Sequence, residues 1–137
     1  MMGGRVASIY LRVSVIDRCD LRCVYCMGPE GIELKSRDDI ASFEEIVSIA
    51  KLIDSVRPIR KLRLTGGEPL VRRDVAKLVR MLREALPSAE LTMTTNGYRL
   101  AELAGDLAAA GLDRKHSEED EHCEANFRQP TLCLVGQ

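Results

Sequence analysis

Segments with the period of a strand and segments with the period of a helix alternate along most of this chain, and this alternation constrains the fold most strongly. Each strand-like segment alternates apolar and polar side chains, and each helix-like segment repeats apolar residues at helical spacing. In chain order, the six segments are residues 8–16, 43–56, 61–65, 71–82, 91–96 and 100–110. Strands that alternate with helices predict a parallel sheet with right-handed crossovers. We therefore expect an α/β fold of about three βα units, part of a (β/α) barrel.

Two of the expected helices carry signals at their ends. Ser42 followed by Glu45 is a capping box, and Pro58 lies just beyond the end of the same helix. Gly111 fits the C-terminal cap of the third helix.

Length, charge and cysteine content limit the class of protein. At 137 residues the chain has enough sequence for one domain but not for a complete (β/α) barrel. Its formal net charge of −1 gives no electrostatic basis for a nucleic-acid or membrane partner. The five cysteines, odd in number and partly clustered, are typical of a reducing compartment, so we expect a cytoplasmic protein. We expect neither a signal peptide nor a membrane span.

Three cysteines, Cys19, Cys23 and Cys26, fall within eight residues directly after the first expected strand. Thiolates are soft ligands that suit zinc or iron–sulfur clusters. Three thiolates from one loop would leave one iron of a four-iron cluster with an open position, whereas a structural zinc site needs four ligands. The other cysteines and histidines lie far along the chain without zinc-type pairing: Cys123, Cys133, His116 and His122. These features favour an iron–sulfur cluster over a zinc site or unrelated buried cysteines.

The segment Gly66-Gly67-Glu68-Pro69 follows the second expected strand. Glycines let a ligand approach the backbone closely, and a carboxylate beside exposed backbone groups can bind an ammonium group. Such a segment could also be an ordinary turn. Its position one βα unit after the cysteines favours a shared site, because ligands of α/β folds gather at the carboxyl ends of the strands.

Cationic and hydroxyl side chains occupy the polar faces of the three expected strands. Parallel strands place equivalent faces on the same side of the sheet, so these side chains should share one face. They are Arg12, Ser14, Lys61, Arg63, Thr65, Thr92 and Thr94. If the apolar face packs on the helices, this face suits an anion, and arginine suits phosphate in particular. In the alternative, the sheet is open and this face meets only solvent.

The spacing C-x3-C-x2-C, with Tyr25 before the last cysteine, resembles the cluster loop of the radical S-adenosylmethionine (SAM) superfamily. The resemblance implies a 4Fe-4S cluster on Cys19, Cys23 and Cys26, whose open iron binds SAM and whose electron cleaves it to a 5'-deoxyadenosyl radical. It also implies that a glycine turn of this type binds SAM, so Gly67→Val should weaken SAM binding and spare the cluster. The SAM-binding residues implied in this way are Tyr25, Gly66, Gly67 and Glu68.

Within that superfamily, the chain is similar from about Leu11 to Arg114 to the GTP-cyclising lyases that open molybdenum cofactor biosynthesis. The similarity is carried by residues 11–15, 17–19, 23–27, 62–70, 94–97 and 110–114. In that family the deoxyadenosyl radical takes the hydrogen from C3' of GTP, and the new radical attacks C8 of guanine. The implied partners are GTP as substrate and an electron donor. The implied GTP contacts are Arg12, Arg63 and Thr94, with Lys61 as a further candidate.

The resemblance ends near Arg114. Residues 1–114 then form the N-terminal part of a radical SAM core domain, and residues 115–137 are a divergent polar tail that we expect to be disordered. The family continues with a further strand and, later, three cysteines for a second cluster, a pattern that Cys123 and Cys133 do not match. We therefore expect no cyclised product from this chain alone.

Two other interpretations stay open. A radical SAM enzyme with a different substrate, such as a peptide, would keep the cluster but would not use Arg12 and Arg63 to bind GTP. A non-catalytic fragment would bind an iron–sulfur cluster or zinc without cleaving SAM.

Overall fold

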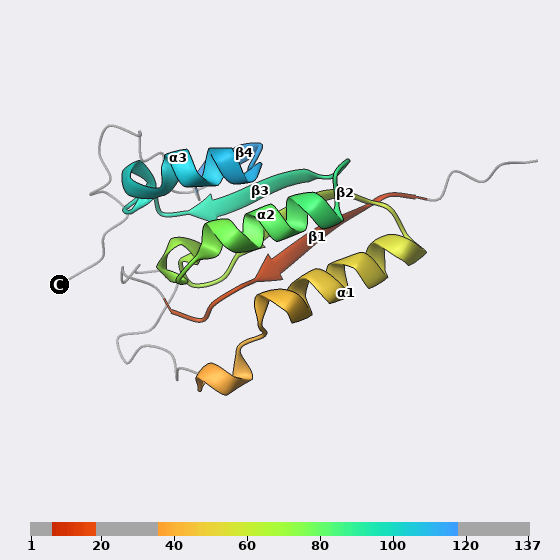
Figure 1. Ribbon diagram of the computed structural model, residues 1–137, viewed down its shortest axis with the longest axis horizontal. Coiled ribbons are helices and arrows are strands. Elements are labelled where there is room, and N and C mark those ends of the chain that lie inside the picture. The colour runs from red at the N-terminus through yellow and green to blue at the C-terminus, as the bar shows by residue number, and fades with distance from the viewer. Residues whose placement is uncertain (1–6, 19–35, 118–137) are drawn as a thin grey trace, which may run out of the picture.

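The computed structural model describes residues 7–18 and 36–117. Within these residues the strands are β1 (Ile9–Ser14), β2 (Ile59–Thr65), β3 (Glu90–Thr95) and β4 (Arg114–Ser117). The helices are α1 (Phe43–Val56), α2 (Val75–Ala85) and α3 (Leu100–Ala110), with short 3-10 turns at η1 (Arg37–Asp39) and η2 (Pro69–Val71). Strands and helices alternate from β2 onward as the sequence predicts (Figure 1).

The strands form one parallel sheet in the order β1-β2-β3-β4. Because each strand pairs with the next one along the chain, right-handed crossovers place all the connecting helices on one face. Figure 1 shows the helices along one side of the sheet, and α2 packs against both α1 and α3. A parallel sheet covered on one face by its own crossover helices is a sector of a (β/α) barrel. The prediction of a partial barrel is confirmed.

The sheet extends further than the sequence indicates. The polar sequence from residue 115 predicts a tail without strand structure, but β4 pairs with β3 from Thr92↔Arg114 to Thr95↔Ser117. A strand of four residues is too short for alternation to reveal it, and its pairing depends on backbone groups that β3 supplies. The edge beyond β3 is therefore paired in this structure. Residues 118–137, with Cys123 and Cys133, lie outside the described residues.

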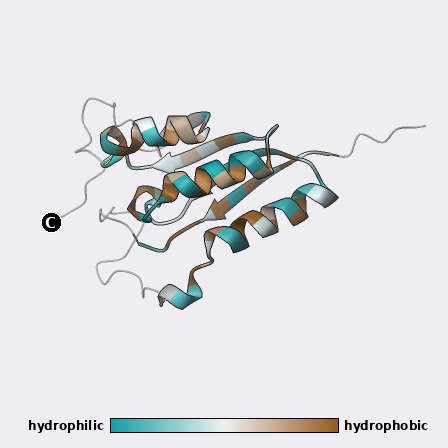
Figure 2. Cartoon of the chain, in the orientation of Figure 1, coloured by the Kyte–Doolittle hydropathy of each residue, from teal (hydrophilic) through white to brown (hydrophobic). Residues whose placement is uncertain are grey.

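The core lies between the sheet and its helices. On β2 and β3, four strand residues that face the helices are at most 2% exposed: Leu62, Leu64, Leu91 and Met93. The helix α2 buries Leu78, Val79 and Leu82 against them. Figure 2 shows hydrophobic and hydrophilic residues alternating along the helices, as expected for helices that bury one side.

Local signals in the sequence set the ends of α1 and α3. Ser42 Oγ accepts from the amide of Glu45 at 3.1 Å, and the Glu45 carboxylate accepts from the amide of Ser42 at 2.7 Å, so the capping box is formed. Gly111, with φ of 102°, caps α3 in the left-handed region. The helix α2 begins at Val75, later than its apolar spacing suggests, because the chain first makes η2.

Candidate functional site at the carboxyl ends of the strands

The glycine turn after β2 packs against the chain that leaves β1. The Gly67 amide donates to the Ile16 carbonyl at 2.8 Å, and the Glu68 amide donates to the Arg18 carbonyl at 2.7 Å. A Cβ on Gly67 would lie 2.1 Å from the Arg18 carbonyl oxygen. One on Gly66, whose φ is +145°, would lie 2.4 Å from that of Ile16. Both positions therefore require glycine.

This packing gives the glycines a structural role in addition to the ligand contact that the sequence predicts. The close approach that requires them is made by the protein's own backbone, at Ile16 and Arg18. Because Arg18 directly precedes Cys19, a side chain at Gly67 would displace the start of the cysteine segment. We therefore no longer expect Gly67→Val to spare the cluster. SAM contacts by Gly66, Gly67 and Glu68 stay predictions.

Glu68 links the turn after β2 to the end of β3. Its side chain is buried, at 2% exposure. Its carboxylate accepts from the Thr95 hydroxyl at 2.5 Å, the Asn96 amide at 2.7 Å and the Leu70 amide at 3.2 Å. These bonds hold two loops together at the carboxyl edge of the sheet. The sequence does not reveal this role of Thr95, although Thr95 lies beside a predicted GTP contact.

The predicted GTP contacts lie on the face of the sheet opposite the helices. Arg12, Arg63 and Thr92 occupy one row across β1, β2 and β3, so the shared polar face is confirmed. Arg12 is exposed, Arg63 is half-buried and Thr92 is fully buried. Thr94 lies two residues nearer the carboxyl end of β3 and is 7% exposed. This face is therefore open to solvent at β1 and buried at β3.

Two buried polar atoms on this face have no hydrogen-bond partner within the described residues. They are Nε of Arg63 and Oγ1 of Thr94. In the same part of the chain, no carboxylate forms an ion pair with Arg12 or Arg63. Like charges directly opposite on neighbouring strands destabilise a sheet, and buried polar atoms normally have partners. An anionic ligand on this face would remove both costs.

Lys61 differs from the two arginines because it has an anionic neighbour. It lies one row nearer the amino ends, between Tyr10 and Glu90 in the sheet register. Its Nζ is 3.8 Å from the Glu90 carboxylate and 5.7 Å from the centre of the Tyr10 ring. The Arg63 guanidinium also lies over this ring, at 5.5 Å. Lys61 is thus the least available of the predicted GTP contacts.

Four predicted site residues, Cys19, Cys23, Tyr25 and Cys26, lie outside the described residues. Within residues 7–18 and 36–117, no group of three or more metal-ligating side chains is assembled. The assignment of Cys19, Cys23 and Cys26 as cluster ligands stays a prediction, and a set of three thiolates fits an iron–sulfur cluster with one open iron. In the same ranges, no helix is long and apolar enough to cross a membrane.

Comparison with known proteins gives both relatives and a structural neighbour. GTP 3',8-cyclase of Petrotoga mobilis is 48% identical over 105 residues, covering 77% of this chain and 32% of that protein. The enzyme of Desulforamulus reducens is 44% identical over 124 residues, covering 89% of this chain and 37% of that protein. The enzyme of Rhodopirellula baltica is 45% identical over 117 residues, with 85% and 33% covered. The chain thus spans about a third of the length of these curated relatives.

A crystal structure of BtrN in complex with AdoMet and 2-DOIA matches the fold with a TM-score of 0.64. The sequence identity is 19%, and the match covers 89% of this chain and 50% of that chain. At this identity the likeness shows the fold alone, and it agrees with a partial (β/α) barrel.

The family model described as the radical SAM superfamily matches residues 13–116, which include both the cysteine segment and the glycine turn. The cofactors expected from the sequence, a 4Fe-4S cluster and SAM, are those of this superfamily. On this match, over most of its length, the chain belongs to the radical SAM superfamily.

Proposed function

We propose that this chain is the N-terminal part of a GTP 3',8-cyclase, the lyase that rearranges GTP in molybdenum cofactor biosynthesis. The observation that carries the proposal is the row of Arg12 and Arg63 on the open face of the sheet, beside the unpartnered Nε of Arg63 and Oγ1 of Thr94. A nucleotide with phosphate and hydroxyl groups would satisfy all of these side chains. The curated relatives carry the same activity in their names.

The two arginines would bind and orient GTP. Guanidinium groups make short, charge-assisted hydrogen bonds to phosphate oxygens, often two at a time. Thr94 Oγ1 would hydrogen-bond the nucleotide beside them, nearer the carboxyl edge where the glycine turn lies. Lys61 would contribute less, because Glu90 already neutralises it in part. Holding the substrate in a reacting geometry is the main contribution of such residues to the rate.

The glycine turn would bind SAM through its carbonyl groups. The amides of Gly67 and Glu68 already donate to Ile16 and Arg18, and the Glu68 carboxylate accepts several hydrogen bonds. An ammonium group has only donors, so it needs carbonyl oxygens such as those of Gly66 and Gly67. We propose that Tyr25 completes this SAM site and that Cys19, Cys23 and Cys26 hold the cluster. The bound cluster and SAM would supply the deoxyadenosyl radical.

The proposal includes an electron donor to the cluster, GTP as the small-molecule substrate and the cytoplasm as the compartment. It does not extend to turnover by this chain alone. A sector of a barrel leaves Arg12 exposed, so water reaches the face where a carbon radical would have to be protected. We expect slow, uncoupled cleavage of SAM to 5'-deoxyadenosine and no cyclised nucleotide.

An anaerobic assay tests this proposal. The chain is reconstituted with iron and sulfide, then incubated with dithionite and SAM, with and without GTP, and both products are separated by chromatography. We expect about four irons per chain, the content of one cubane cluster. This iron should be lost when Cys19, Cys23 or Cys26 is replaced by serine. Replacement of Cys123 or Cys133 should leave the iron content unchanged.

Tightly bound zinc without broad visible absorption would contradict the cluster. Cyclised nucleotide in proportion to deoxyadenosine would show that this sector suffices.

A further inference from the structure

One arginine side chain holds the backbone on both sides of the cysteine segment. Arg72, just after η2, donates from Nη1 to the Val15 carbonyl at 2.6 Å and from Nη2 to the Ala41 carbonyl at 2.7 Å. Its guanidinium also lies over the Phe43 ring, 4.4 Å from the centre. Val15 precedes residues 19–35 and Ala41 follows them. Arg72 therefore joins the chain where it enters and where it leaves this segment.

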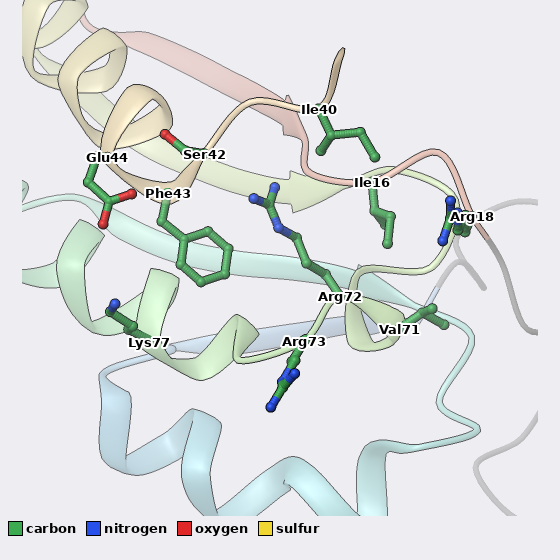
Figure 3. Close-up of a pocket in the computed structure, with 10 residues that line it drawn as sticks. All are labelled: Ile16, Arg18, Ile40, Ser42, Phe43, Glu44, Val71, Arg72, Arg73 and Lys77. Carbon is green, nitrogen blue, oxygen red and sulfur yellow. The ribbon is translucent and has the colours of Figure 1, made fainter. Parts of the chain in front are cut away.

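The surroundings of Arg72 form a cleft of about 500 Å³ between the end of β1 and the start of α1. Figure 3 shows the Arg72 guanidinium inside this cleft, beside Phe43, whereas the side chain of Arg73, which also lines the cleft, points away from that guanidinium. Burial lowers the pKa of Arg72 below its usual value, which marks its environment as partly desolvated. Within the described residues no carboxylate pairs with it, so the two carbonyls are its hydrogen-bond acceptors there. Desolvating a cation is costly unless its hydrogen bonds are well made.

A second arginine, Arg83, uses the same chemistry at the opposite end of the sheet. Its guanidinium donates to the carbonyls of Ala89 at 2.8 Å and Gly111 at 2.8 Å, in the loops that lead into β3 and β4. It also forms an ion pair with Asp113 at 2.6 Å. In barrels of this type the carboxyl ends of the strands carry function and the amino ends carry stability. Arg72 and Arg83 therefore each hold two backbone carbonyls, Arg72 at the carboxyl ends of the strands and Arg83 at the amino ends.

We propose that Arg72 is a positioning residue that fixes the span between Val15 and Ala41, which the cysteine segment must close. Fixing the two ends of a segment lowers the entropic cost of closing it, which favours cluster binding by Cys19, Cys23 and Cys26. The planar fork of arginine reaches both carbonyls at once, which the single ammonium of lysine cannot do in the same geometry. The role in cluster retention rests on the proposed function, whereas the fixed span itself does not.

The first test measures iron retention. The full chain and its Arg72→Lys, Arg73→Lys and Arg83→Lys variants are reconstituted anaerobically, and the rate of iron loss to a chelator is followed by the visible absorption. We expect Arg72→Lys to lose iron at least about tenfold faster, the scale on which supporting residues affect metal sites. Arg73→Lys should match the parent, because the Arg73 side chain is 95% exposed. Arg83→Lys should lower the urea midpoint of unfolding but leave the rate of iron loss unchanged.

The second test uses the chain without iron, so it stands even if the cluster assignment fails. Hydrogen exchange is followed by NMR at three reporter amides: Gly67 and Glu68, which donate to Ile16 and Arg18, and Ile46, which donates to Ser42. Arg72→Lys should speed exchange at these amides and spare Asp113, whose amide donates to Leu91 at the other end of the sheet. Arg83→Lys should do the reverse. Equal changes at both ends, or iron loss that follows global stability in both variants, would overturn the proposal.

Discussion

The two faces of the sheet use alternate residues of the same strands for different purposes. On the face that the helices cover, Leu62 and Leu64 are at most 1% exposed and pack in the core. On the opposite face, Arg63 lies between them in sequence, in register with Arg12 and with a buried Nε that has no partner in the described part of the chain. The covered face is satisfied by the protein itself. On the open face, Arg63 Nε and Thr94 Oγ1 have no partner within the described residues, which supports our proposal that this face binds an anionic ligand.

The strongest test of this comparison substitutes neighbours on β2. Leu62→Asp places an unpaired charge in the core, and we expect it to unfold the chain, because burying such a charge costs several kcal/mol. Arg63→Ala should change the free energy of unfolding by less than about 1 kcal/mol, because the lost contact with the Tyr10 ring is offset by removal of an unpartnered buried atom and a like-charge neighbour. Urea unfolding followed by circular dichroism measures both. Equal destabilisation by the two substitutions would contradict the proposed difference between the two faces of the sheet.

The next test concerns the glycine turn that follows β2. We expect Gly67→Val to lower stability by roughly 3 kcal/mol or more, because its Cβ would collide with the Arg18 backbone. Iron uptake should fall with it, since Arg18 leads into Cys19. The control is Gly105→Ala in α3, where a Cβ meets nothing within 4 Å. There we expect a gain of about 0.5–1 kcal/mol from helix propensity. A Gly67 variant as stable as its parent would show that the turn can move away.

A smaller effect separates two neighbouring threonines on β3. Thr95→Val removes the hydroxyl that donates to the buried Glu68 carboxylate, so stability should fall by about 1–3 kcal/mol. Thr94→Val removes a hydroxyl without a partner in the described residues, so its effect on unfolding should be close to zero. Thermal unfolding of the two isosteric variants measures the difference. A larger loss for Thr94→Val would mean that its hydroxyl has a structural partner outside the described residues.

Much of the fold could be predicted from the sequence because its signals are local. The period of the segments gave the βα order, and the capping box at Ser42 placed the start of α1. The fourth strand was missed, because its pairing depends on β3 and not on its own pattern. The packing of Gly67 against the Arg18 backbone could not be predicted either, because the two residues are far apart in the sequence. The contacts of Arg72 are backbone carbonyls, which carry no sequence signal.

The most direct test of the central claim is isothermal titration of the reconstituted full chain with GTP. The matched variants are Arg63→Ala and Arg60→Ala, which each remove an arginine side chain from β2. Arg60 is exposed and lies near the amino end of the strand. We expect Arg63→Ala to weaken GTP binding at least tenfold, about 1.4 kcal/mol, the scale of one charge-assisted hydrogen bond. Arg60→Ala should leave the affinity unchanged. Equal affinity in both variants, or no binding of GTP by the parent chain, would contradict the assignment of the open face to the nucleotide.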